Sequence, residues 1–154
     1  MTDDFPFWTF SLAVYGRGGV PEACLALQEA YGIDVNLLLF CCWAGAGGTA
    51  LDEAAMKRCA DAAGAWHGEI VRGLRTVRQR LKGGFGSVRG EDAEALRRKI
   101  LGLELEAEKI EQGLLAGTMS VPAAPAIPAD EFFRGRVENA LGPGARKSVV
   151  ARPG

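Results

Sequence analysis

Residues 32–43 read Gly32-Ile33-Asp34-Val35-Asn36-Leu37-Leu38-Leu39-Phe40-Cys41-Cys42-Trp43. Between Val35 and Ala46, Asn36 is the only polar side chain. A helix that is apolar on every side belongs in the middle of a bundle, where its neighbours contact it all round. The run is too short to cross a bilayer, which takes about 20 residues. We therefore predict that Val35–Ala46 is the central helix of a small all-α domain, with Asp34 as its N-terminal cap.

Amphipathic segments precede and follow this helix, and glycine-rich turns separate them. An aromatic segment at residues 4–15 and a segment at residues 20–31 come first, and Gly32 is a left-handed terminator for the second. Residues 49–63 follow the central helix, and Gly64 marks a kink or a boundary. The sequence predicts a single bundle of about five to six helices.

Two longer segments are expected to form an antiparallel hairpin across the turn at residues 83–87. The first segment repeats apolar residues every three or four positions, at Trp66, Ile70, Leu74, Val77 and Leu81. The second has a similar repeat, typical of a coiled-coil seam, at Leu96, Ile100, Leu103, Ala107, Ile110 and Leu114.

The chain changes character after residue 117. Pro122, Pro125 and Pro128 predict an extended linker over residues 118–129. A short amphipathic helix is expected at residues 130–141, and residues 142–154 are typical of a disordered basic tail. The helical bundle is thus assigned to residues 1–117.

Charge is unevenly distributed along the chain, although the net charge is only −1. Residues 1–64 carry eight acidic and three basic side chains, whereas residues 65–99 carry four acidic and nine basic ones. Such a chain either pairs its own segments or presents a basic strip to a partner.

The cysteines and the N-terminus indicate the compartment. None of the four cysteines forms a Cys-x-x-Cys pair, so the zinc and thioredoxin spacings are both missing. The N-terminal Met-Thr-Asp-Asp is acidic, unlike the positive start of a signal peptide. We expect reduced thiols in a cytoplasmic protein with no membrane span.

Several distinctive blocks occur in the first half of the chain: Phe7-Trp8-x-Phe10-Ser11-Leu12, Gly32-x-Asp34-Val35-Asn36-Leu37-Leu38-Leu39-Phe40, Trp66 and Leu74-Arg75-x-x-Arg78. They resemble an uncharacterised proteobacterial family, domain of unknown function 2390. The family often has proline where this chain has Gly73. The resemblance implies a bacterial cytosolic protein and brings no activity, ligand or catalytic residue with it.

Polar side chains at the mouth of the apolar core are the candidate ligand-binding residues. We predict that an apolar pocket is rimmed by Gln28, Asp34, Asn36, His67 and Arg75. The alternative is structural: Asp34 caps the helix, Asn36 satisfies backbone groups in its first turn, and His67 is half-buried beside a core tryptophan.

A basic face is the candidate interaction surface. At about 100° per residue, one side of the predicted helix carries Arg72, Arg75, Arg78 and Lys82. Phe132 and Phe133 in the C-terminal segment extend the candidate surface. The alternative is a solvated face that pairs with acidic side chains of the next helix, such as Glu104, Glu106, Glu108 and Glu111.

No motif for metal, cofactor or catalysis stands out. His67 is the single histidine and has no carboxylate four positions away on either side. The glycine-rich turns lack the Lys-Ser/Thr of a phosphate loop. The sequence predicts no catalytic residue, no metal ligand and no cofactor, but a nucleophile brought to His67 by the fold would leave an enzyme possible.

Two functions are compatible with these features. The first is a non-enzymatic interaction or adaptor module, which binds another protein through the basic face, the C-terminal segment or both. The second is a small-ligand-binding protein or enzyme that uses the apolar pocket. A third interpretation is RNA or DNA binding through Arg72–Lys82, which the charge of the chain does not favour because the chain is not basic overall. The sequence does not predict the oligomeric state.

Overall fold

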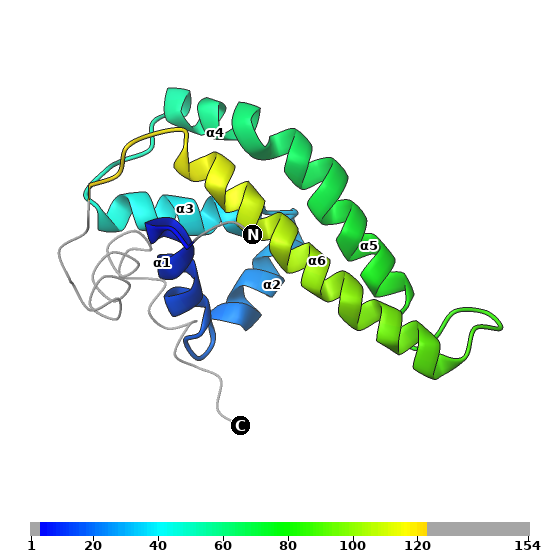
Figure 1. Cartoon of the computed structure of the whole chain (residues 1–154). Coiled ribbons are helices and arrows are strands. Elements are labelled where there is room, and N and C mark those ends of the chain that lie inside the picture. Colours follow the sequence, from blue (N-terminus) through cyan, green and yellow to red (C-terminus); the bar gives the residue numbers. More distant parts are fainter. Residues whose placement is uncertain (1–3, 123–154) are drawn as a thin grey trace.

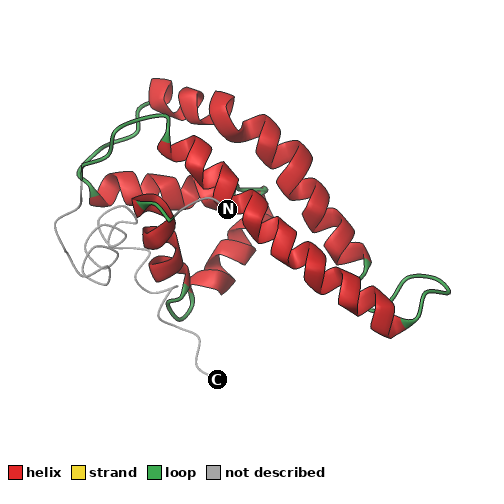
Figure 2. Cartoon of the chain, viewed as in Figure 1, coloured by secondary structure: helices red, strands yellow, loops and turns green. Residues whose placement is uncertain are grey.

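The computed structural model describes residues 4–122, which fold into helices joined by short turns. The elements are α1 (Pro6–Tyr15), α2 (Val20–Tyr31), α3 (Val35–Ala46), α4 (Glu53–Trp66), the π-helix η1 (His67–Val71), α5 (Arg72–Arg80) and α6 (Gly90–Ala116). Within this part of the chain there is no strand, and Phe85 and Val88 form only an isolated bridge. The prediction of an all-α bundle is confirmed (Figure 2).

The longest helix, α6, contacts most of the other elements. It runs back alongside the continuous rod of α4, η1 and α5, so the predicted hairpin is present, and it also contacts α1 and α3 (Figure 1). The apolar helix α3 packs on α6 and α1. The centre of the bundle is therefore shared between α3 and α6.

Local sequence signals explain the start of α3. Gly32 has a φ of 63° and ends α2 in the left-handed conformation that glycine tolerates. The Asp34 carboxylate then accepts hydrogen bonds from the backbone N–H groups of Asn36 and Leu37, at 2.9 and 3.3 Å. Asp34 therefore caps α3 as expected.

Aromatic side chains from α1 and α3 form the core. The Phe7 ring meets the edge of Phe40 and stacks on Trp43, with both centroid distances 5.3 Å. Phe7 and Phe40 are fully buried, and Leu115 of α6 closes the same cluster. Aromatic pairs of this kind add to the free energy of burial.

The rod has no break near Gly64, where the sequence predicted a kink or a boundary. The helix continues through Gly64, and a π turn at His67–Val71 follows. Ile70 and Val77 were expected to face α6, but both are exposed, and Val71 is buried instead. A π turn takes one residue more than an α turn, so it moves the inward face along by one position.

The seam of α6 is displaced by one residue over part of its length, whereas Ile100 and Ala107 are buried as predicted. Leu103, Ile110 and Leu114 are exposed, as is Leu96, so the predicted apolar seam is wrong at these positions. The buried positions are Ala93, Ile100, Glu104, Ala107, Glu111, Gln112 and Leu115. Two of them are carboxylates, because basic side chains of the rod face them.

The predicted C-terminal segments lie largely outside the described residues. This applies to the helix at residues 130–141, to Phe132 and Phe133, and to the basic tail. Among residues 4–122, no helix has both the length and the apolarity that crossing a bilayer requires.

Candidate ligand-binding site

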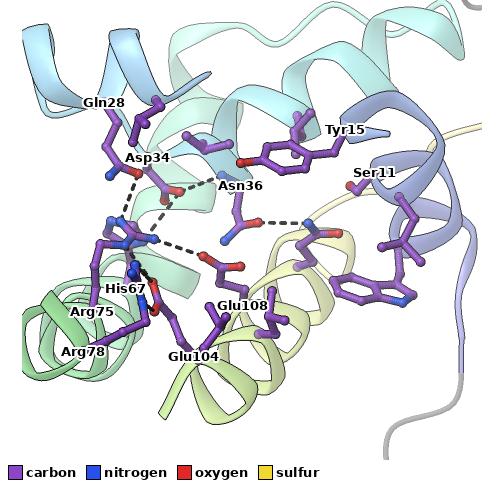
Figure 3. A pocket seen from close by; sticks show the side chains of 18 residues that line it. Ser11, Tyr15, Gln28, Asp34, Asn36, His67, Arg75, Arg78, Glu104 and Glu108 are labelled. Carbon is purple, nitrogen blue, oxygen red and sulfur yellow. Dashed lines mark hydrogen bonds and ion pairs between the residues drawn. The ribbon is translucent and has the colours of Figure 1, made fainter. Parts of the chain in front are cut away.

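A cavity of about 340 Å³ opens between α1, α2, α3, the rod and α6 (Figure 3). One part of its wall is apolar and comes mainly from Trp8, Leu12, Leu25, Leu39, Leu101 and Leu105. The rest is polar. The five residues predicted to rim a pocket all line this cavity: Gln28, Asp34, Asn36, His67 and Arg75.

Arg75 ties three elements together at the polar wall. Its Nη1 donates to Gln28 Oε1 of α2 at 3.0 Å. Its Nε and Nη2 donate to Glu104 Oε1 and Glu108 Oε1 of α6, at 2.9 and 3.0 Å. A guanidinium group presents its donors in a rigid fork, which suits this role. Arg75 therefore holds Gln28, Glu104 and Glu108 in place at the polar wall.

Arg78 shares one of these carboxylates. Its Nε and Nη2 both donate to the Glu104 carboxylate. Burial opposes ionisation of Glu104, but the hydrogen bonds from Arg78 and Arg75 outweigh it and lower its pKa. At Glu108 burial outweighs Arg75, so the pKa of that carboxyl is raised.

Asn36 takes part in a buried polar chain that crosses from α3 to α6. Its Nδ2 donates to Glu111 Oε2 at 2.9 Å, and Gln112 Nε2 donates to Asn36 Oδ1 at 2.9 Å. All three side chains are buried. The Asn36 side chain therefore reaches a neighbouring helix and does not serve the first turn of α3.

His67 lies between two carboxylates. Its Nδ1 is 3.2 Å from Oε2 and 3.1 Å from Oε1 of Glu111, and 3.5 Å from Oδ1 of Asp34. The hydrogen bond with Glu111 is the main cause of a raised His67 pKa. Burial raises the pKa of Glu111 to about 6. Both groups therefore hold a proton more readily than they do in water.

The π turn aligns His67 with Arg75. Along an uninterrupted α-helix these two residues would point about 80° apart, because each residue turns the helix by about 100°. The extra residue of η1 takes up about 100° of this rotation. The His67 and Arg75 side chains therefore point in nearly the same direction. π turns often occur at functional sites. Sequence reasoning missed this one.

Sequence reasoning named Glu104, Glu108 and Glu111 only as partners of the basic face in the structural alternative. It did not place Glu104 and Glu108 in the polar wall of the cavity, or Glu111 beside His67. Glu104, Glu108 and Glu111 follow one another at spacings of four and three, which places them on one face of α6. The spacing of these three carboxylates could have indicated an inward acidic face of α6. The apolar repeat, displaced by one residue, favoured a different inward face. The expectation of no metal ligands came from helical spacing alone, which does not cover residues that tertiary structure brings together.

Three buried polar atoms lack a hydrogen-bond partner among the described residues. They are Ser11 Oγ, Glu111 Oε1 and Gln112 Oε1. Ser11 and Gln112 line the cavity, and Ser11 lies across it from Arg75 (Figure 3). Polar atoms of this kind are costly to bury unless something bonds to them.

The basic face is only partly available to a partner. The Arg75 and Arg78 side chains are 16% and 23% exposed and pair with α6. Arg72 and Lys82 are exposed. The pairing of Arg75 and Arg78 with Glu104 and Glu108 agrees with the structural alternative, in which the basic face pairs with acidic side chains of the next helix.

Comparison with known proteins gives one match. Residues 6–115 match the family model described as protein of unknown function (DUF2390). No curated protein and no solved structure matches the chain.

Proposed function

The chain belongs to the DUF2390 family, and from its own cavity we propose that it binds a small amphipathic molecule. The carrying observation is the division of the cavity wall into an apolar part and a polar part. The volume of about 340 Å³ is within the range of small-molecule sites, which are mostly apolar with a few placed polar groups. No reaction is included in this proposal.

The apolar wall accounts for the body of the ligand. Leu12, Leu25 and Leu105 are about half exposed, although each lines the cavity. An apolar group that covers them removes their surface from water, which stabilises the complex by roughly 25 cal/mol per Å² before the costs of association.

The polar wall accounts for the head group. Both guanidinium groups are already held by carboxylates, so an anion would have to displace Glu104 or Glu108. The buried Ser11 Oγ, across the cavity from Arg75 (Figure 3), and Gln112 Oε1 are open to hydrogen bonds. A neutral or cationic head group that donates hydrogen bonds fits these acceptors and the paired carboxylates better than an anion does.

Protein interaction through the basic face remains a second proposal, with narrower support. Arg72 and Lys82 are its exposed members, whereas Arg75 and Arg78 serve internal pairs. We also propose a cytoplasmic location in a bacterium, which is compatible with four free cysteines.

Two leucines of α6 allow a matched test of ligand binding. Leu105 is 50% exposed and lines the cavity, whereas Leu103 is 51% exposed and does not. Purified protein is titrated with the fluorescent apolar amine N-phenyl-1-naphthylamine. We expect the wild type to bind this probe. Leu105→Trp should weaken binding at least fivefold, because the larger indole ring occupies space in the cavity, and Leu103→Trp should leave binding unchanged.

Equal binding by both variants, or no binding by the wild type, contradicts the proposal. Circular dichroism of each variant checks that the helices are intact. Native mass spectrometry of the same preparations then identifies small molecules that co-purify with the wild type and not with Leu105→Trp.

A further inference from the structure

We propose that Asp34, His67 and Glu111 bind one divalent transition-metal ion beside the polar wall of the cavity. The three residues come from the start of α3, from the π turn and from α6. Each offers one ligand atom, and these atoms lie within 4.8 Å of one another. The proposal goes beyond ligand binding and does not depend on it.

Two of the three distances within this set are close to those of a coordination shell, and all three ligand atoms lie within 4.8 Å of one another. Ligand atoms about 2.1 Å from a metal ion are roughly 3.0 to 3.4 Å apart in octahedral or tetrahedral geometry. His67 Nδ1 is 3.1 Å from Glu111 Oε1 and 3.5 Å from Asp34 Oδ1. Small side-chain movements therefore suffice to close the shell around an ion.

Glu111 supplies an independent observation. Its side chain is fully buried, and Oε1 has no hydrogen-bond partner within residues 4–122. Oε2 accepts a hydrogen bond from Asn36 and also bonds with His67 Nδ1, whereas Oε1 lies 3.1 Å from the same nitrogen without a hydrogen bond. An ionised carboxylate buried in this way needs a positive partner, and a metal ion at Oε1 provides one.

The surrounding hydrogen bonds hold two of the ligands in place. Asn36 donates to Glu111 and is itself held by Gln112. The Asp34 carboxylate is fixed by the backbone of α3, and its oxygens keep lone pairs for an ion. Metal sites depend on such outer contacts for the orientation of their ligands.

The donor set indicates the class of ion. One imidazole nitrogen and two carboxylate oxygens suit Zn²⁺, Mn²⁺ or Fe²⁺ better than a soft ion that prefers sulfur. The two carboxylates balance a charge of +2 and outweigh the positive end of α3. Three protein ligands leave at least one position open, and Asp34 and His67 line the cavity.

The single histidine makes the test direct. Full-length, tag-free protein is treated with EDTA, dialysed and titrated separately with MnCl₂ and ZnCl₂ by calorimetry. The imidazole NMR signals, which come only from His67, are recorded in the same titrations. We expect one equivalent of at least one ion to bind, with broadening or shifting of these signals at the same stoichiometry.

Variants separate the proposed ligands from their neighbours. Glu111→Gln keeps an acceptor for Asn36, and Asp34→Asn keeps a capping side chain. Each is expected to weaken metal binding at least tenfold. Glu108→Gln, on the same wall of α6, is the matched control and should bind the ion as the wild type does.

Other outcomes overturn the inference. They are no binding of either ion, binding that leaves the His67 signals unchanged, or an equal loss in Glu108→Gln and Glu111→Gln. In the first case, a protonated His67 bridging two carboxylates is the better description. Binding of N-phenyl-1-naphthylamine in the presence of EDTA is measured separately, so failure of the metal site and failure of ligand binding are distinguishable.

Discussion

Arg75 Nε donates to Glu104 Oε1 across 2.9 Å, so a guanidinium of the rod and a carboxylate of α6 meet inside the fold. Both side chains are largely withdrawn from water. The uneven charge of the chain is therefore partly neutralised between its own segments. Removing one member of such a buried pair leaves the other uncompensated.

Replacement of Glu104 tests this pair. Glu104→Gln is expected to lower the free energy of unfolding by about 3 kcal/mol at pH 7, because Arg75 and Arg78 lose their shared carboxylate. Urea denaturation measures the difference. Glu106→Gln, an exposed neighbour on α6, is the control and should change stability by less than about 0.5 kcal/mol.

The effect of Glu104→Gln should also depend on pH. A carboxyl whose pKa is lowered by folding contributes stability above its ordinary pKa of 4.5, and this contribution is lost as the pH falls through the folded-state value. The difference between wild type and variant should therefore be complete at pH 7 and shrink below pH 4.5. A constant difference at all pH values would show that the charge is not responsible.

Charge reversal should destabilise the protein at the two half-buried members of the basic face and not at the two exposed ones. Arg75→Glu with Arg78→Glu places four acidic side chains together with Glu104 and Glu108, so we expect a loss of at least about 3 kcal/mol in stability. Arg72→Glu with Lys82→Glu changes exposed residues and should leave the thermal midpoint within about 3 °C. Thermal unfolding of both double variants decides; equal midpoints contradict the internal role of Arg75 and Arg78.

The free energy of unfolding should depend on how many polar groups of the buried chain through Asn36 lose their hydrogen-bond partner. Asn36→Leu removes the donor to Glu111 and the acceptor for Gln112, at a cost of about 2–4 kcal/mol in unfolding free energy. Combining it with Glu111→Met and Gln112→Leu removes the unpaired groups as well. We expect the combined variant to be more stable than Asn36→Leu alone in the same urea assay, and a further loss would contradict this account.

The π turn should tolerate a deletion better than an insertion. Deleting Glu69 removes the extra residue, so a plain α-helix still points Arg75 toward α6. Inserting an alanine after Glu69 turns α5 by a further 100° or so and separates Arg75 from Glu104. Thermal unfolding should show a midpoint lowered mainly in the insertion variant, and the reverse order would contradict the register argument.

Some features of the fold could be read from the sequence because they depend on neighbours along the chain. The cap at Asp34 and the end of α2 at Gly32 follow from side-chain oxygens and backbone freedom. The apolar run of α3 predicted a core helix, and Leu39, Phe40 and Ala44 are buried, whereas most of the other residues of α3 are half-buried. These local signals do not bring Gln28, His67 and Arg75 to Asp34 and Asn36; the tertiary structure does so at the cavity.

Only the tertiary structure decided which faces of the long helices point inward. On α6 the apolar repeat and the acidic repeat differ by one residue, and the sequence contains both. The acidic face was selected because Arg75, Arg78 and His67 lie opposite it, and because a π turn moved their own face by one position. Local periodicity cannot resolve a shift of one residue, whereas charge pairing between two helices can. The same pairing carries Glu111 to Asp34 and His67, which no spacing along the chain connects.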